Sequence, residues 1–235
     1  MTTAAESSTD RSLFYERFAA DFDARMNRYE VGKRLRLIFE DVLGSHDLNG
    51  VQLLDAGCGT GLFSECASRR GAEVTSMDVG EGLLAEVAKK CESRRVVGDV
   101  QSLPFDDGAF DVVICTEVIE HVVSPTRGIA ELARVLRPGG TLVLSTPNRL
   151  WHPAIRLAGA LRLRPYEGFE NWIGWSTLER AVTEAGLTIG RRTGFNALPF
   201  VLPATYRLID RLDRLGDGPL GRLMINMLVV ASRPA

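Results

Sequence analysis

Short apolar runs alternate with helical hydrophobic periods between residues 51 and 146. Five of these runs have the length and composition of buried strands: 51–56, 73–78, 95–98, 110–115 and 141–146. They are apolar at successive positions, which is typical of parallel strands covered on both faces. Because the runs alternate with helical segments over short connections, the pattern predicts an α/β protein with an open, doubly wound sheet.

Helix signals surround these strands. Ser124 followed by Pro125 predicts a helix N-terminus, and Arg137–Gly140 predicts the end of that helix and a turn into the next strand. Residues 176–179 have the form of a capping box, which predicts a helix that stops at Gly186. The apolar spacing over 11–43 predicts one or two N-terminal helices, and two closing strands are expected at 187–192 and 224–232.

We therefore expect one domain over residues 11–235, preceded by a polar, disordered tail at 1–10. Residues 149–175 fit neither the helical nor the strand pattern and are interpreted as a cap insertion. Residues 195–220 are interpreted as a second lid element.

Composition narrows the possible functions. The chain has 235 residues, is 45% hydrophobic and carries a formal net charge of −2, which argues against nucleic acid as its main partner. No apolar run reaches the roughly 18 residues of a membrane span, and no secretory signal precedes the domain. The four cysteines form no framework, so reduced thiols and a cytoplasmic location are expected: Cys58, Cys66, Cys91 and Cys115.

A glycine-rich loop follows the first strand. Gly57, Gly59 and Gly61 allow a tight turn and close approach of a ligand, and a helix N-terminus behind them favours an anion. Since the third glycine falls one residue earlier than in a dinucleotide fingerprint, a small carboxylate is a better fit than a pyrophosphate. Asp78 ends the second strand, where a carboxylate accepts from ribose hydroxyls, and Asp99 is placed to accept from an adenine amino group. The alternatives are a solvated strand-end carboxylate at Asp78 and a turn-favouring one at Asp99.

Several motifs together resemble a class I S-adenosylmethionine-dependent methyltransferase: the run Leu53–Gly61, Asp78, Gly98–Asp99 and the run Leu103–Asp111. The resemblance implies a seven-stranded, mostly parallel sheet with a reversed last strand. It implies that Asp55 and the loop Gly57–Gly61, Cys58 included, hold the methionine part of the cofactor. It places the ribose at Asp78, the adenine at Asp99 and the sulfonium beside Thr116, with Val79 and Val100 as further cofactor-binding residues. S-adenosylhomocysteine would be the product.

An acidic–histidine cluster follows the fourth strand. If this segment is helical, Glu117, Glu120 and His121 share one face. They are then candidate ligands for Mg²⁺, or His121 is a metal-free general base, or the cluster is structural. The cluster resembles the E-x-x-E-H segment of ubiquinone-pathway O-methyltransferases and of small-RNA 2′-O-methyltransferases, which implies metal-assisted transfer to a hydroxyl. A further histidine typical of the metal-using relatives is missing near Asn171.

The insertion is basic and aromatic. Residues 149–166 hold four arginines among apolar residues, which suits either a cap over the site or weak contact with an anionic membrane. Its large aromatic side chains favour an aromatic or lipid-like acceptor, unless they form a small core of their own. They are Trp151, Tyr166, Phe169, Trp172 and Trp175.

These features predict an O-methyltransferase for a small apolar or aromatic acceptor. N- or C-methylation of a small metabolite remains an alternative, as does a non-catalytic S-adenosylmethionine-binding subunit. The early third glycine weighs against a nicotinamide-dependent oxidoreductase. The negative net charge weighs against RNA methylation.

Overall fold

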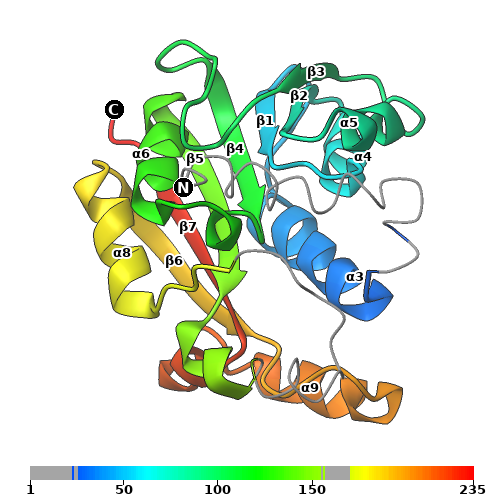
Figure 1. Ribbon diagram of the computed structural model, residues 1–235, viewed down its shortest axis with the longest axis vertical. Coiled ribbons are helices and arrows are strands. Elements are labelled where there is room, and N and C mark those ends of the chain that lie inside the picture. The colour runs from blue at the N-terminus through cyan, green and yellow to red at the C-terminus, as the bar shows by residue number, and fades with distance from the viewer. Residues whose placement is uncertain (1–22, 24–25, 155, 157–169) are drawn as a thin grey trace, which may run out of the picture.

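The computed structural model describes residues 23, 26–154, 156 and 170–235 (Figure 1). The predicted tail at 1–10, the first part of the predicted N-terminal helices and most of the predicted cap insertion therefore lie outside the described residues.

A seven-stranded sheet forms the centre of the molecule, with the strand order β3-β2-β1-β4-β5-β7-β6. Only β7 runs against its neighbours, β5 and β6, so the predicted seven-stranded, mostly parallel sheet with a reversed last strand is confirmed. The strands are β1 Gln52–Ala56, β2 Glu73–Asp78, β3 Arg94–Val97, β4 Phe110–Thr116, β5 Leu136–Pro147, β6 Thr188–Phe195 and β7 Asn226–Ser232.

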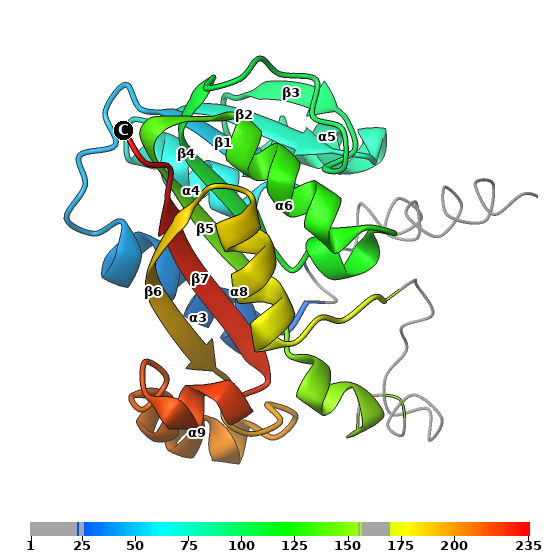
Figure 2. The same ribbon diagram turned by 90° about the vertical axis from the view of Figure 1, so that its left-hand side faces the viewer.

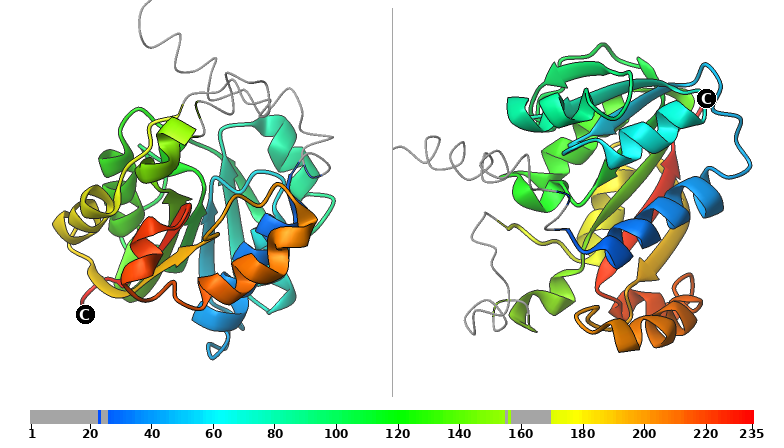
Figure 3. Two further views of the ribbon diagram at one scale, coloured as in Figure 1. Left: turned by 90° about the horizontal axis from the view of Figure 1, so that it is seen from below. Right: turned by 90° about the vertical axis from the view of Figure 1, so that its right-hand side faces the viewer.

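Helices cover both faces of the sheet (Figures 2 and 3). One buried cluster joins α6 and α8 to the sheet, and another joins the segment from α3 to Leu43, together with α4, to the opposite face. The helices are α3 Arg28–Arg36, α4 Leu62–Arg69, α5 Glu81–Val87, α6 Pro125–Arg134, α8 Trp175–Glu184 and α9 Tyr206–Asp213. Shorter turns are the π-helical η2 Leu37–Val42 and the 3₁₀ turns η3 Ile119–His121, η4 Arg149–Trp151, η5 Pro203–Thr205 and η6 Pro219–Leu223.

Two predicted boundaries are wrong. The predicted capping box does not form, because α8 already begins at Trp175 with Gly174 as its N-cap. The Glu179 carboxylate instead pairs with Arg192 and Arg222, at 3.0 and 2.8 Å. The fifth strand begins at Leu136 rather than after the glycines.

The early start of β5 has a local cause. Leu136 lies opposite Phe110 on β4, and the next pair is Val112 with Thr141, so the extra residues of the glycine turn bulge out on the β5 side. The Arg233 guanidinium donates to the backbone oxygens of Arg134 and Leu136, which holds the turn against the end of β7.

Two other predicted helix ends are confirmed. The Ser124 hydroxyl accepts from the Arg127 amide with Pro125 in the first helical turn, and Gly186 follows α8 at a φ of +82°. The four cysteines are free thiols. None of the helices in the described part of the chain has the length and apolarity that a bilayer crossing requires.

Candidate active site

The glycine loop joins β1 to α4 in a left-handed conformation. Gly57, Gly59 and Gly61 have φ angles of +75°, +54° and +83°, which side chains with a Cβ rarely adopt. A Cβ at Gly57 would also lie 2.4 Å from the Val118 side chain. Glycine is favoured at position 57 both by the positive φ and by the close contact with Val118 of the acidic segment.

Two aspartates hold this loop from different sides. Asp78, at the end of β2, accepts from the amides of Gly59 at 2.9 Å and Gly80 at 3.1 Å. Asp55 is buried and accepts from the Ser64 hydroxyl of α4 at 2.7 Å. Burial raises the pKa of the Asp55 carboxyl to about 6. Asp78 thus lies at the strand end, as predicted, while Asp55 braces the loop against α4.

The loop after β3 also has the predicted carboxylate. Asp99 is exposed and accepts from the Gln101 amide at 2.8 Å, as in an Asx turn, and from the Gln101 side chain. Gln101 in turn accepts from the amide of Ser124 at the start of α6, at 2.9 Å. The neighbouring Val100 is buried, and Val79, after β2, is half-buried. Gln101 is a connecting residue that sequence reasoning missed.

Thr116 ends β4 beside a buried ion pair that sequence reasoning also missed. The Arg34 guanidinium donates to the Thr116 hydroxyl at 3.3 Å and to Glu30 at 2.9 Å. Arg34 and Glu30 are one turn apart on α3, and both are buried. The spacing of these two charges on one helix face was a signal for their pairing.

The acidic–histidine segment does not form the α-helix considered from the sequence. Glu117 has a φ of +55°, and only Ile119–His121 make a short 3₁₀ turn. Glu117 accepts from Ser145 at 2.8 Å and from Asn226 at 2.9 Å, while Glu120 accepts from Thr146 at 3.1 Å. The two carboxylates are therefore held by β5, which lies beside β4, and by β7, the next strand of the sheet.

Burial raises the pKa of both carboxyls well above the usual glutamate range, and the Glu120 charge raises that of Glu117 further. His121 Nε2 lies 3.9 Å from Glu120 Oε1, at the more exposed end of the cluster. The described residues bring together no group of three acidic, histidine or cysteine side chains that could hold a metal ion. The Mg²⁺ ligand set considered from the sequence is thus not assembled among the described residues.

A chain of asparagines extends the cluster. The Asn226 amide that donates to Glu117 accepts from Asn196 at 3.0 Å. In the described part of the chain, Glu117 and Asn196 are the two non-glycine residues with positive φ. Strained backbone of this kind persists where its surroundings hold it, and it is common at functional sites.

The cap aromatics divide between several environments. Trp175 lies in the main core with α6 and the sheet. It is therefore not part of a separate core of the insertion. Trp172 is buried beside His152, with ring centres 5.4 Å apart, and Trp151 donates to the Leu223 carbonyl at 2.8 Å. Tyr166 and Phe169 lie outside the described residues.

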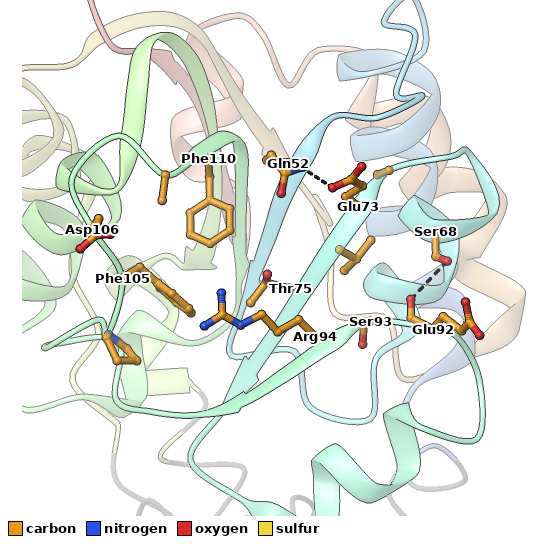
Figure 4. A pocket seen from close by; sticks show the side chains of 14 residues that line it. Gln52, Ser68, Glu73, Thr75, Glu92, Ser93, Arg94, Phe105, Asp106 and Phe110 are labelled. Carbon is orange, nitrogen blue, oxygen red and sulfur yellow. Dashed lines mark hydrogen bonds between the residues drawn. The ribbon is translucent and has the colours of Figure 1, made fainter.

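A hollow with a volume of about 630 Å³ lies at the opposite, amino-terminal ends of the strands. Figure 4 shows the side chains that line it. Its lining includes the first residues of four strands: Gln52, Glu73, Arg94 and Phe110. In doubly wound sheets, ligands bind at the carboxyl ends of the strands, where the glycine loop and acidic cluster lie. This hollow is therefore separate from the candidate active site.

Comparisons with known proteins identify the family of the chain. Residues 54–144 match the model of a methyltransferase domain. The chain is 32% identical to the ubiquinone biosynthesis O-methyltransferase of Alkalilimnicola ehrlichii over 89% of its own length and 92% of that protein. A shorter match, 42% identical, covers 44% of the chain and 46% of the Xanthomonas oryzae protein of the same name.

Solved structures share the fold. The magnesium protoporphyrin IX methyltransferase of Synechocystis, with bound S-adenosylhomocysteine, superposes with a TM-score of 0.69, 20% identity and coverage of 97% of this chain and 99% of that one. A Haloferax volcanii putative methyltransferase, solved in complex with a methyltransferase activator, gives 0.68 and 20%, covering 94% and 98%. With the full-length match at 32% identity, these findings show that the chain belongs to the class I S-adenosylmethionine-dependent methyltransferases.

Proposed function

We propose that this methyltransferase acts on the hydroxyl group of a small apolar or aromatic acceptor. The observation that carries the proposal is the acidic pair of the half-buried Glu117 and the buried Glu120 beside His121, at the carboxyl end of β4. A carboxylate pair that is costly to bury and a strained Glu117 are features of reaction sites rather than of cores. The A. ehrlichii relative, an O-methyltransferase by name, supports transfer to oxygen.

The residues around the glycine loop fit S-adenosylmethionine. Gly57 leaves no room for a Cβ, and Asp78 presents a carboxylate at the strand end where a ribose is expected. We assign the methionine part to Asp55, Gly57, Cys58, Gly59 and Gly61, and the ribose to Asp78 and Val79. The adenine is assigned to Asp99 and Val100, and the reacting end to Thr116. Bound there, the cofactor supplies an electrophilic methyl group.

The chain's own contribution is positioning and proton removal. His121 accepts the proton of the acceptor hydroxyl as its oxygen is methylated, and imidazole is the side chain that most often serves as a general base. Glu120, 3.9 Å from His121 Nε2, orients the imidazole, and Glu117 anchors the segment to β5 and β7. We propose this metal-free form because Glu117 is already hydrogen-bonded on both carboxylate oxygens.

The test is a screen of hydroxyl, amine and carbon acceptors with labelled S-adenosylmethionine. Methylation of apolar phenols or alcohols by the wild type, and its loss in His121→Ala, is the expected result. Transfer only to amines or carbon would contradict the O-methyltransferase assignment. A protein that binds S-adenosylmethionine but methylates no acceptor of any class would instead support a binding subunit.

A further inference from the structure

Exposed apolar side chains gather at one end of the molecule. Nine large apolar side chains are exposed in the described part of the chain, and six of them lie between residues 201 and 223. We call this set the apolar end face: Val201, Leu202, Leu208, Leu215, Leu220 and Leu223. It is built on η5, α9 and η6, which lie together at the lower end in Figure 1 and face the viewer in the left panel of Figure 3.

Arginines accompany the apolar end face along α9 and its C-cap. Ile209 is buried against the body, so positions on the other side of the helix face outward. Arg207, Arg211 and Arg214 follow one another at spacings of four and three residues, which aligns them along one side. All three are exposed, and none forms an ion pair with another described residue.

The acidic residues of the same segment are engaged elsewhere. Asp210 accepts from the Tyr29 hydroxyl at 2.7 Å and lies 3.1 Å from Lys33 Nζ. Asp213 pairs with Lys33 at 2.5 Å, and Asp217 pairs with Arg191 at 3.2 Å. Pairing neutralises the acids within the protein and leaves the outer side of α9 positively charged.

We propose that the apolar end face docks on an anionic phospholipid bilayer. Arginines at headgroup level gain from the negative surface potential, and leucines enter the interface, so the two signals act together. The exposed apolar side chains here are all aliphatic, whereas protein–protein interfaces are enriched in aromatic residues. A bilayer is therefore the better match than a protein partner. The proposal goes beyond the methyl-transfer function and does not depend on it.

The face is also connected to the candidate active site. Asn148, just after β5, donates to the carbonyls of Arg222 and Met224, and Trp151 donates to that of Leu223. Docking would therefore place the carboxyl ends of the strands near the bilayer surface.

The experiment uses the full chain and sedimentation with vesicles. Wild type should pellet with vesicles of phosphatidylglycerol and phosphatidylcholine, and far less with phosphatidylcholine alone. The triple variant Arg207→Glu, Arg211→Glu, Arg214→Glu should bind the anionic vesicles at least about 100-fold more weakly, since each basic residue contributes roughly tenfold or less and is here reversed. The matched triple variant of exposed arginines elsewhere, Arg95→Glu, Arg127→Glu, Arg180→Glu, has the same net charge and should bind like wild type.

A second pair of variants tests the apolar part. Leu208→Ser with Leu215→Ser should weaken vesicle binding, whereas Val97→Ser with Val123→Ser, also exposed, should leave it unchanged. Unfolding curves and S-adenosylmethionine binding verify that every variant is folded. The proposal is overturned if the wild type does not pellet with anionic vesicles, or if the matched arginine variant loses binding equally. It is also overturned if light scattering shows a dimer that the leucine variant dissociates without any vesicle effect.

Discussion

The Asp78 carboxylate has two roles, one in holding the glycine loop and one in the proposed ribose site. Its carboxylate accepts from the Gly59 and Gly80 amides and is assigned to the ribose. Asp78→Ala should raise the Kd for S-adenosylmethionine by about 30- to 1000-fold, the equivalent of ~2–4 kcal/mol of charge-assisted hydrogen bonding. Calorimetry provides the measurement, with the exposed Asp106→Ala as a control that should bind normally. Unchanged affinity in a folded Asp78 variant would remove the ribose assignment.

His121 distinguishes the two mechanisms considered for the acidic cluster. As a metal-free base it should lose ~10²–10⁴-fold in turnover on conversion to Ala, and EDTA should leave the wild-type rate unchanged. Glu117→Gln and Glu120→Gln should lose less, because they position the segment. Initial rates with the acceptor found by screening measure this. If EDTA abolishes turnover and Mg²⁺ restores it, the cluster binds a metal after all.

Burial of the Glu120 carboxyl lowers the free energy of unfolding by an amount that depends on pH. Its carboxyl is buried and its pKa is raised to about 8, so the folded protein keeps a proton that the unfolded chain releases near pH 4.3. The free energy of unfolding should therefore fall as pH rises from about 4.3 towards 8. Glu120→Gln removes this titration and should stabilise the protein by ~1–3 kcal/mol at pH 8, with little effect at pH 4.

Urea unfolding at both pH values measures the effect of Glu120→Gln. The exposed Glu184→Gln on α8 is a control without a pH-dependent gain. A Glu120 variant that is destabilised equally at both pH values would show that the side chain is a charged structural partner instead.

At the scale of elements, the glycine loop and the acidic segment are packed together through Gly57 and Val118. Gly57→Ala should destabilise the protein by ~1–3 kcal/mol, because the added Cβ overlaps Val118 and the φ angle is positive. It should also weaken S-adenosylmethionine binding. Gly128→Ala, inside α6 and with only an ordinary contact to Val100, should be neutral or stabilising. Thermal unfolding and calorimetry compare the two, and equal effects would contradict this packing role.

Signals carried by neighbouring residues predicted the elements well. The glycine loop, Ser124 at the start of α6 and the strand ending at Asp78 need only local chemistry. The capping box failed because α8 begins at Trp175, before Ser176, and the Glu179 carboxylate pairs instead with Arg192 and Arg222, which come from other elements. The positive φ of Glu117 could not be predicted from its neighbours in sequence either, since Glu117 is held by Asn226, 109 positions further along the chain.

At the scale of the whole molecule, Lys33 ties the N-terminal helix α3 to α9. Its ammonium is buried and lies 2.5 Å from Asp213, which also accepts from the amides of Asn196 and Ala197. Lys33→Met should lower the free energy of unfolding by about 3 kcal/mol, because it leaves a half-buried carboxylate without its cation. Lys89→Met, which removes an exposed pair with Glu86, should cost less than ~1 kcal/mol.

Urea unfolding compares these lysine variants, and equal losses would show that α9 is not held by this contact. No sequence pattern pointed to the Lys33–Asp213 pair, because 180 positions separate the two residues. The seven-stranded, mostly parallel sheet with its reversed last strand, in contrast, followed from the alternation of strands and helices and from the family resemblance.

The position of β7 has a consequence for biosynthesis. β7 is the last strand of the sheet to leave the ribosome, yet it lies between β5 and β6 and supplies Asn226 to Glu117. Until it emerges, the nascent chain carries the open hydrogen-bonding edge of β5 and an unpaired β6, which are templates for aggregation. We therefore expect a chain that ends at residue 225 to aggregate more readily than the full chain, and the hydrogen bond from Asn226 to Glu117 forms only once β7 has joined the sheet.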